Sequence, residues 1–338
     1  MERGNETSTT DLILLGFSPE ISPPSFLISL TLLIYIVAVT GNTVLIRLIW
    51  ADLRLHTPMY FLLGQLSLID LALISTTVPK MAADFFSGRR SISLPACGTQ
   101  IFFFLTLAGA ECLLLTLMSF DRSVAICHPL RYPVLLNRGV RHQMVTGCWV
   151  GGAVNALIHT LYITRLPICN SREIHHFFCE VMTYLKLSCE ETSSYQLGVL
   201  GASVVFILFP FGLIVASYAL IFFTVLRMDS REGRRKALTT CSSHLTVVTL
   251  YFGPGIFVYV TPPSSHSPER DQGISLFSTI LTPMLNPLIY SLRNQEVLGA
   301  LRRVLGKLLG KCSVRQWRRN VLRLSRLPLG NGRTGSLP

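Results

Sequence analysis

Long apolar stretches recur along the chain and are separated by short polar segments. Each stretch is close to the roughly 17–25 residues that an α-helix needs to cross the hydrocarbon core of a bilayer. Because lipid offers no partner to unpaired backbone N–H and C=O groups, each crossing is expected to be helical. The pattern therefore predicts an all-α membrane protein, a seven-transmembrane helix bundle. The predicted crossings are Phe26–Ile49, Met59–Pro79, Ile101–Phe120, Met144–Leu166, Leu197–Leu226, Leu238–Val260 and Ile274–Leu292.

Composition and charge add an orientation to this bundle. Half of the 338 residues are hydrophobic and 14% are charged, against about 25% charged residues in an average soluble domain. The net charge of +12 is concentrated in the first, third and fifth connections and in the tail, whereas the other connections are close to neutral. The positive-inside rule then places the N-terminus outside and the tail in the cytoplasm. The expected partner of the basic residues is the lipid surface and not nucleic acid.

The chain is accordingly divided into three parts: an extracellular N-terminus at 1–25, a seven-helix domain at 26–292, and a cytoplasmic tail at 293–338. Within the tail, apolar residues recur at helical spacing over Gln295–Leu309 beside Arg302 and Arg303, which predicts a short amphipathic helix 8 lying in the membrane interface. The basic extension beyond it has two open interpretations, a membrane-surface or trafficking segment and a readthrough terminus.

Residues on the outer side suggest modification in the secretory pathway. Asn5 begins an Asn-Glu-Thr acceptor for glycosylation. Cys97 lies at the outer end of the third predicted helix, and Cys169, Cys179 and Cys189 lie in the following outer loop, in an oxidising compartment. Four cysteines allow three pairings, and spacing does not choose among them. The pairing that we predict, Cys97 with Cys179 and Cys169 with Cys189, would hold the loop as a lid over the bundle.

An acid and an arginine stand side by side at the inner end of the third predicted helix. Charges at this depth cost free energy and are expected to be functional. Asp121 is placed to hold Arg122 until another helix moves, so the pair is a candidate latch in a protein with two conformations.

The motifs along nearly the whole chain resemble those of the rhodopsin-like (class A) G-protein-coupled receptors and, within them, those of the vertebrate olfactory (odorant) receptors. Any one of them is modest support, whereas their joint occurrence in this order is specific. The matching segments are Gly41-Asn42, Leu55-His56-Thr57-Pro58-Met59-Tyr60-Phe61-Leu62, Leu66-Ser67 with Asp70, Val78-Pro79-Lys80-Met81, Met118-Ser119-Phe120-Asp121-Arg122-Ser123-Val124-Ala125-Ile126-Cys127-His128-Pro129-Leu130-Arg131-Tyr132, Ser217-Tyr218, Lys236-Ala237-Leu238-Thr239-Thr240-Cys241-Ser242-Ser243-His244-Leu245 and Pro283-Met284-Leu285-Asn286-Pro287-Leu288-Ile289-Tyr290-Ser291-Leu292-Arg293-Asn294.

The resemblance implies a plasma-membrane odorant receptor that binds small volatile molecules and activates a stimulatory heterotrimeric G protein, which raises cyclic AMP. It implies that Arg122 is held by Asp121 at rest and is released when the sixth helix swings outward. Tyr218 and Tyr290 would then receive hydrogen bonds in the opened state. The alternative is that both tyrosines only anchor their helices at the membrane interface.

A second polar group is expected at mid-membrane depth. Asp70, Glu111 and Asn286 together resemble the sodium pocket of the family, with Glu111 as an additional acid typical of odorant receptors. A sodium ion among these oxygens would neutralise them and favour the resting state. The alternative is a hydrogen-bonded network of protonated carboxyl groups without a metal. Apart from this ion, no cofactor is expected.

The ligand pocket is expected in the outer half of the bundle, between the third, fifth, sixth and seventh helices and under the lid. Its mostly apolar character suits a small molecule of low polarity, with one hydrogen bond from Tyr259. Phe104 stands where amine receptors of the superfamily carry an acid, so an amine salt bridge is not expected. Offsets along the helices from Arg122, Pro287 and the motif of the sixth helix predict which residues face the ligand. These are Phe104, Leu105, Ala108, Gly109, Ala202, Val205, Phe206, Gly255, Ile256, Tyr259 and Thr279.

Some residues depart from the family pattern. Ser123 replaces the usual tyrosine after Asp-Arg, and Tyr251-Phe252 reverses the common order, which is expected to remove a phenol from the pocket floor.

The rival functional classes are a transporter or channel, an enzyme, and a non-olfactory member of the same superfamily. A transporter would show paired broken helices and a channel a charged pore lining, and neither is visible. His175-His176 with Cys179 suggests a metal site only superficially, because these residues fit the family's His-His-Phe-Phe-Cys pattern. No enzymatic activity is expected.

Overall fold

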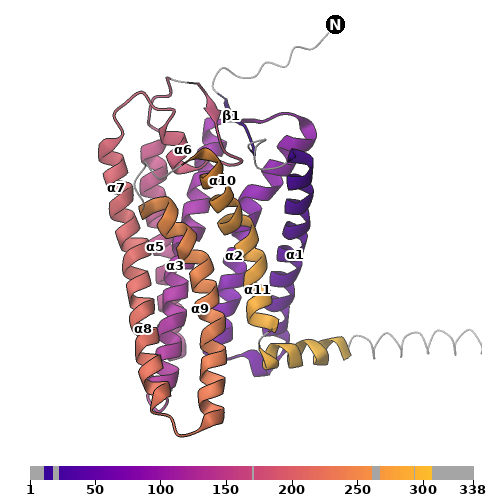
Figure 1. Cartoon of the computed structure of the whole chain (residues 1–338), viewed down its shortest axis with the longest axis vertical. Helices are drawn as coiled ribbons and strands as arrows, with labels where there is room; N and C mark the ends of the chain where they lie inside the picture. The colour runs from indigo at the N-terminus through magenta and orange to yellow at the C-terminus, as the bar shows by residue number, and fades with distance from the viewer. Residues whose placement is uncertain (1–10, 18–22, 170, 261–266, 293, 307–338) are drawn as a thin grey trace, which may run out of the picture.

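A bundle of seven membrane-length helices forms the body of the molecule in a computed structural model that describes residues 11–17, 23–169, 171–260, 267–292 and 294–306 (Figure 1). The first four crossings are single helices, and the fifth and seventh each contain one π-helical turn. The predicted number and order of crossings are confirmed. In chain order the crossings are α1 (Pro24–Ala51), α2 (Pro58–Ser87), α3 (Leu94–Cys127), α5 (Arg138–Ile163), α7 (Ser193–Ser203) with a π-helical turn (Val204–Leu208) and α8 (Phe209–Leu226), α9 (Arg231–Val260), and α10 (Pro268–Leu276) with a π-helical turn (Phe277–Leu281) and α11 (Thr282–Leu292).

Most helices extend beyond the apolar stretches that predicted them. Helix α2 continues past Pro79 and ends at Gly88, whose φ of 69° lies in the left-handed region that glycine adopts without a steric penalty. Helix α3 begins at Leu94, where the side chain of Ser93 accepts a hydrogen bond from the Ala96 N–H at 3.4 Å. Hydrophobicity marks the part of each helix that lies in lipid, whereas the helix itself continues into the polar layers.

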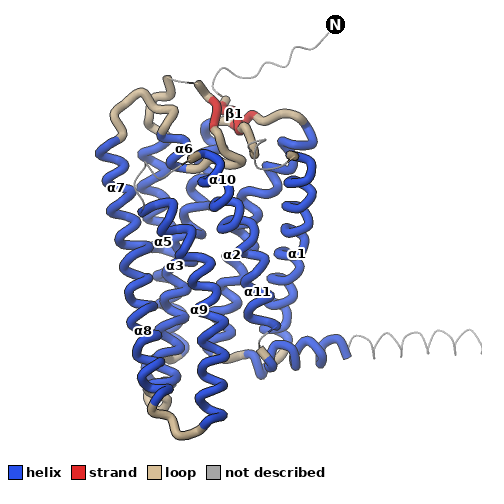
Figure 2. Tube along the Cα trace, in the orientation of Figure 1, coloured by secondary structure: helices blue, strands red, loops and turns tan. Residues whose placement is uncertain are grey.

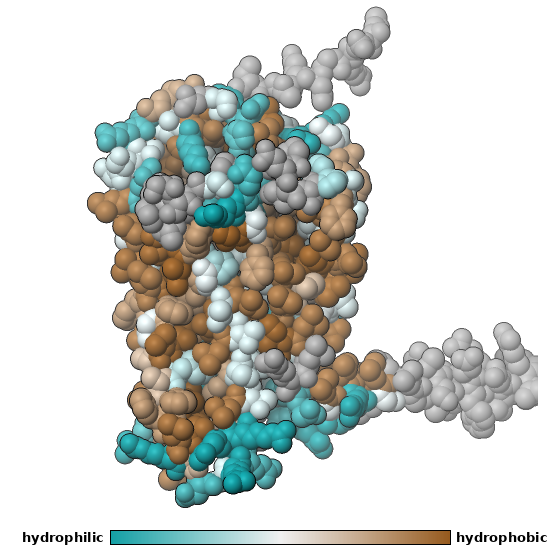
Figure 3. Space-filling model, in the orientation of Figure 1, coloured by the Kyte–Doolittle hydropathy of each residue, from teal (hydrophilic) through white to brown (hydrophobic). Residues whose placement is uncertain are grey.

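The surface of the bundle is apolar at mid-height. Figure 3 shows a broad hydrophobic band across the visible face, with hydrophilic residues at both ends. Large side chains such as Phe209, Phe222 and Phe223 are more than half exposed within the bundle helices. Such exposure is unfavourable in water but matches a lipid environment. We refer to the end that carries the N-terminus as the outer end, following the predicted orientation.

Helix α3 occupies the centre of the bundle, in contact with α2, α5, α8 and α9. Its contact with α5 is the most extensive and depends on small residues. A Cβ atom on Gly152 of α5 would lie 2.5 Å from the Thr106 carbonyl oxygen and 2.8 Å from the Ala110 nitrogen of α3. The two backbones therefore meet without an intervening side chain.

A three-stranded sheet covers part of the outer end (Figure 2). Strand β1 (Leu12–Leu14) lies between β2 (Ser91–Ile92), to which it is antiparallel, and β3 (Glu173–Ile174), to which it is parallel. Leu12 and Leu14 are buried against the loop between α5 and α7. The sequence did not predict this strand, because a run of so few apolar residues carries no periodicity.

Residues 295–306 form the predicted amphipathic helix 8 at the inner end. It is attached to the first inner loop by an ion pair between Arg303 Nη2 and Asp52 Oδ2 at 2.6 Å, and the hydrogen bond from Arg303 lowers the pKa of Asp52. The Tyr60 hydroxyl donates to Glu296 Oε2 at 2.8 Å. Asn5, the last three residues of the predicted helix (307–309) and the basic extension beyond them lie outside the described residues.

Candidate functional site

Two disulfides hold the loop between α5 and α7 over the outer end of the bundle. Cys97 at the start of α3 is bonded to Cys179, with 5.6 Å between their Cα atoms, and Cys169 is bonded to Cys189, with 5.5 Å between theirs. The Cys179 N–H also donates to Gln100 Oε1 at 2.9 Å. The structure contains the predicted pairing, so the loop is fixed to α3 both covalently and through its backbone.

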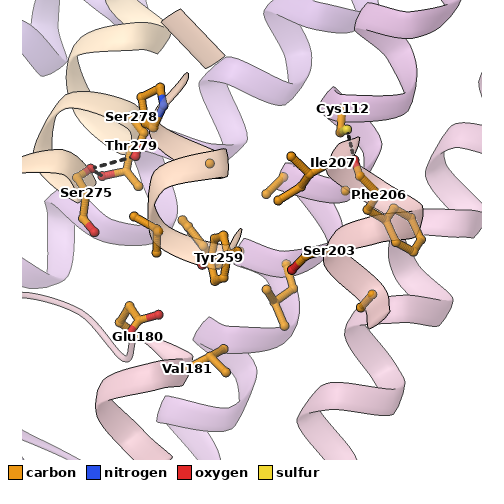
Figure 4. A pocket seen from close by; sticks show the side chains of 18 of the residues that line it. Cys112, Glu180, Val181, Ser203, Phe206, Ile207, Tyr259, Ser275, Ser278 and Thr279 are labelled. Carbon is orange, nitrogen blue, oxygen red and sulfur yellow. Dashed lines mark hydrogen bonds between the residues drawn. The ribbon is translucent and has the colours of Figure 1, made fainter. Parts of the chain in front are cut away.

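A cavity of about 150 Å³ lies beneath this lid, between α3, α5, α7, α9, α10 and the π-helical turns (Figure 4). An engineered apolar cavity of similar volume, in another protein, accommodates benzene. Most of the lining is apolar, with hydroxyl groups from Ser203, Ser275, Ser278 and Thr279. The cavity is therefore suited to one small molecule with few polar atoms.

Nine of the eleven residues predicted to face the ligand line this cavity. They are Phe104, Leu105, Ala108, Gly109, Ala202, Phe206, Gly255, Tyr259 and Thr279. Their contact with a ligand stays a prediction, whereas their common location is observed.

The other two predicted residues, Val205 and Ile256, do not line this cavity. Val205 is 58% exposed on the outside of the bundle, and Ile256 packs against the main core cluster. The lining residues of the fifth crossing recur at positions 199, 202, 203, 206 and 207, which is the spacing of one helix face, and position 205 falls on the opposite side. The lining positions of the sixth crossing are 251, 252, 254, 255, 258 and 259, and position 256 is not among them.

Several polar residues that line the cavity were not predicted from the sequence. Asn155 and His159 come from α5, a helix that was not expected to contribute, and the His159 Nδ1 atom lies 2.7 Å from the Tyr195 hydroxyl. Glu180 comes from the lid itself. A loop residue has no helical phase, so its direction could not be read from spacing.

The reversed pair on α9 keeps its phenol in the cavity wall. Tyr251 and Phe252 both line the cavity, and the Tyr251 hydroxyl donates to the Ala108 carbonyl oxygen of α3. The expectation that the reversal removes a phenol from the floor was wrong, because both residues fall within the broad inward face of the helix. The bond links α9 to α3 through two residues of the cavity wall.

The histidine pair of the lid does not form a metal site. Cys179 is in a disulfide and offers no thiolate. The His176 ring lies 4.5 Å from the rings of both Phe177 and Phe178, and burial lowers its pKa to about 3. His176 is therefore a neutral member of an aromatic cluster that forms the underside of the lid.

The three residues of the expected ion pocket meet at mid-height. The Asn286 amide donates to both oxygens of Asp70, at 3.0 and 3.2 Å. Glu111 lies close enough to Asp70 for their carboxyl groups to interact, and neither Glu111 oxygen has a hydrogen-bond partner of good geometry among the described residues. The Asn286 carbonyl oxygen is likewise buried and unpaired there. These oxygens fit a hard monovalent cation, which would satisfy them.

The acid and arginine at the inner end of α3 form the expected pair. Arg122 Nη2 lies 2.7 Å from Asp121 Oδ2, and the Tyr132 hydroxyl donates to the other oxygen, Oδ1, at 2.8 Å. Burial and then the charge of Asp121 raise the pKa of Tyr132, so its hydroxyl remains a donor. The contact of Tyr132 with Asp121 was not predicted from the sequence, because Tyr132 lies beyond the helix, in the short α4 (Tyr132–Leu135).

The two tyrosines assigned to the switch have different partners. The Tyr218 hydroxyl lies 2.6 Å from His244 Nδ1 of α9, whereas the buried Tyr290 hydroxyl has no hydrogen-bond partner among the described residues. Arg122, His244 and Tyr290 line one small internal cavity. The guanidinium is thus close to polar groups of α9 and α11. Ser123, the departure in this motif, turns its hydroxyl back to the Phe120 carbonyl oxygen at 2.9 Å.

Comparison with known proteins agrees with these features. A family model described as olfactory receptor matches residues 31–308. The human proteins olfactory receptor 2L5 and olfactory receptor 2M5 are 53% and 52% identical to the chain, over 90% and 91% of its length and 97% and 98% of their own. Human olfactory receptor 2M2 is 51% identical over 90% of the chain and 87% of its own length.

Proposed function

The chain belongs to the olfactory receptor family, and on that premise we propose that it binds a small, largely apolar volatile molecule in the cavity under the lid and activates a stimulatory, olfactory-type G protein that raises cyclic AMP. Membership of this family makes the protein a multi-pass plasma-membrane receptor that detects odorants through G-protein signalling, and not an enzyme. The class of ligand and the type of G protein are the proposed part.

One observation carries the proposal: the same two helices line the ligand cavity and carry the inner polar cluster. Helix α3 contributes Ala108 to the cavity and Arg122 to the cluster, and α9 contributes Tyr251 and His244. A ligand that binds the two arrangements of α9 with different affinity shifts the equilibrium between them. Outward movement of α9 would separate His244 from Tyr218 and open the inner end for the G protein.

Cells that express the receptor should raise cyclic AMP when they are exposed to at least one member of a panel of small volatile odorants. Parent cells without the receptor provide the control, and surface expression is measured in parallel. Ligand-dependent ion or solute flux without any change in cyclic AMP would contradict the proposal and favour a transporter or channel.

We further propose that Asp70, Glu111 and Asn286 hold a sodium ion that stabilises the resting arrangement. The unpaired oxygens of Glu111 and Asn286 beside Asp70 support this proposal. The ion would neutralise carboxyl groups in a region where an uncompensated charge is costly. The competing arrangement is a pair of protonated carboxyl groups that needs no ion.

Purified receptor is expected to melt several degrees higher in sodium chloride than in choline chloride at equal ionic strength. A ligand present at 100 times its Kd adds about 2.7 kcal/mol of stability. The Asp70→Asn variant should lose this sodium effect because it removes the charge that attracts the ion. Asp84→Asn, at an acid on the same helix that pairs with Lys80, should retain it. Equal melting temperatures of the unmodified receptor in the two salts would rule out the ion.

A further inference from the structure

Glu180 is an acidic residue in the wall of a cavity whose lining is otherwise mostly apolar. It follows Cys179 directly, so the disulfide to Cys97 fixes its backbone against α3. It also precedes the short helix α6 (Val181–Leu185) as its N-cap residue. The side chain is 6% exposed, which is a low value for an acid.

The two oxygens of this carboxyl group have different surroundings. Oε2 accepts hydrogen bonds from the Thr183 N–H at 2.7 Å and from the Thr183 hydroxyl at 3.0 Å. Oε1 is buried and has no hydrogen-bond partner among the described residues. Figure 4 shows the carboxyl group of Glu180 at the edge of the cavity, directed inward toward the space below Tyr259. One oxygen is therefore committed to the helix cap, and the other is available to the cavity.

No described side chain of the cavity lining donates a hydrogen bond to this oxygen. The lining contains no lysine or arginine, and its remaining polar groups are hydroxyls, one amide, one imidazole and the Cys112 thiol. A buried acceptor without a donor costs free energy, and a donor supplied by a bound molecule would recover it. Hydrogen bonds to an ionised carboxylate are shorter and stronger than those between neutral groups.

Building on the proposed receptor function, we propose that Glu180 is the polar anchor of the cavity and that it selects small apolar molecules that carry one hydrogen-bond donor, a hydroxyl or an amine, at one end. The remaining wall holds the apolar part of such a molecule by shape and dispersion. Because Phe104 replaces the acid that amine receptors carry on the third helix, the sequence argued against amine ligands. Glu180 supplies an acid to the cavity from the lid instead.

Opposing influences act on the pKa of Glu180. Burial holds it above its ordinary value and the charge of Asp271 raises it further, while hydrogen bonds from the Met182 and Thr183 backbone and from the Thr183 hydroxyl lower it. The donors to Oε2 favour the ionised form, in which Oε1 is an acceptor. A donor from the ligand would favour that form further.

The test is a matched ligand series on one ring: benzyl alcohol, benzylamine, benzaldehyde, benzyl methyl ether and toluene. In cells that express the unmodified receptor, the alcohol or the amine is expected to raise cyclic AMP at a concentration at least about tenfold lower than the ether or toluene, given the strength of hydrogen bonds to charged groups. A larger response to benzylamine than to benzyl alcohol would indicate an ion pair, and the reverse order a neutral donor.

The Glu180→Gln variant sharpens this test because it exchanges an acceptor for a donor. The α6 cap needs an oxygen toward Thr183, so the glutamine NH₂ group should face the cavity. Potency of the alcohol and the amine is expected to fall at least about tenfold, while that of benzaldehyde, which only accepts, should rise. Thr183→Ala is the matched control, because it removes one bond to Oε2 without altering Oε1 and should preserve the ligand ranking.

Thermal stabilisation of the purified, unmodified receptor by benzyl alcohol, compared with toluene, provides a measurement that needs no variant. Equal ranking of donor and non-donor ligands, or an unchanged ranking in a Glu180→Gln variant that reaches the surface, would overturn the inference. A receptor that responds to other odorants but to neither benzyl alcohol nor benzylamine would also overturn the inference about Glu180. The proposed receptor function would then stand.

Discussion

Replacement of Arg122 by alanine is expected to abolish the odorant-dependent rise in cyclic AMP while leaving the receptor folded at the cell surface. Arg122 is the cationic group in the small inner cavity and is paired with Asp121 at 2.7 Å. Without the guanidinium, an outward movement of α9 would expose no charge-assisted donor to the G protein. The signal should fall to the level of cells that lack the receptor, measured over a full range of odorant concentration.

Arg131→Ala is the matched control for this prediction. Arg131 lies in the inner loop that follows α3 and is exposed, so its loss removes an equal charge from the inner face without removing a residue of the cluster. This variant should retain most of the signal. A normal response from Arg122→Ala at equal surface expression would contradict the assignment of Arg122 to the switch.

Replacement of Gly152 by valine is expected to prevent correct folding. A Cβ at this position would lie 2.5 Å from the Thr106 carbonyl oxygen and 2.8 Å from the Ala110 nitrogen, so α5 and α3 would have to move apart. Overpacking costs about 1–3 kcal/mol or more when backbone must shift, out of a total stability of about 5–15 kcal/mol for an ordinary domain. Surface expression and the yield of purified receptor should both fall steeply.

Gly147→Val, on the same helix, is the matched control. It shows whether any glycine-to-valine substitution in α5 reduces expression, or only one at the contact with α3. A Cβ at Gly147 would meet nothing within 4 Å, so the variant should reach the surface at close to the normal level. If the two variants expressed equally well, the close contact between α3 and α5 would not be required for folding.

The number and order of the crossings were predicted correctly from the sequence, because a bilayer restricts the length and composition of a segment that crosses it. Stretches such as Phe26–Ile49 have the length and apolarity of a helical crossing and are too long for a single transmembrane strand, and a helix pairs its backbone polar groups within the segment, as lipid requires. The helix ends were predicted less well, because polar residues such as Arg231 and Arg138 belong to the helices without belonging to the apolar pattern.

The prediction of the site succeeded for residues whose helical phase was fixed by a nearby motif. Phe104 and Gly109 were placed relative to Arg122 on one continuous helix, and both line the cavity. The placement of Val205 failed because it lies in the π-helical turn Val204–Leu208, which changes the helical phase between this residue and the Ser217-Tyr218 motif of the same crossing. Glu180 and β1 could not be predicted at all, because the direction of a loop side chain and the pairing of a short strand depend on distant segments.

The sequence by itself determined the membrane class, the seven crossings, the position of the charged pair in α3 and the family, since all of these follow from local composition and from motifs read along the chain. Only the tertiary structure decided which cysteines pair, which side chains share the cavity, and that one carboxylate oxygen of the lid faces it unpaired. These properties depend on contacts between residues far apart in the chain, and the energy of such contacts is defined only after the helices have packed.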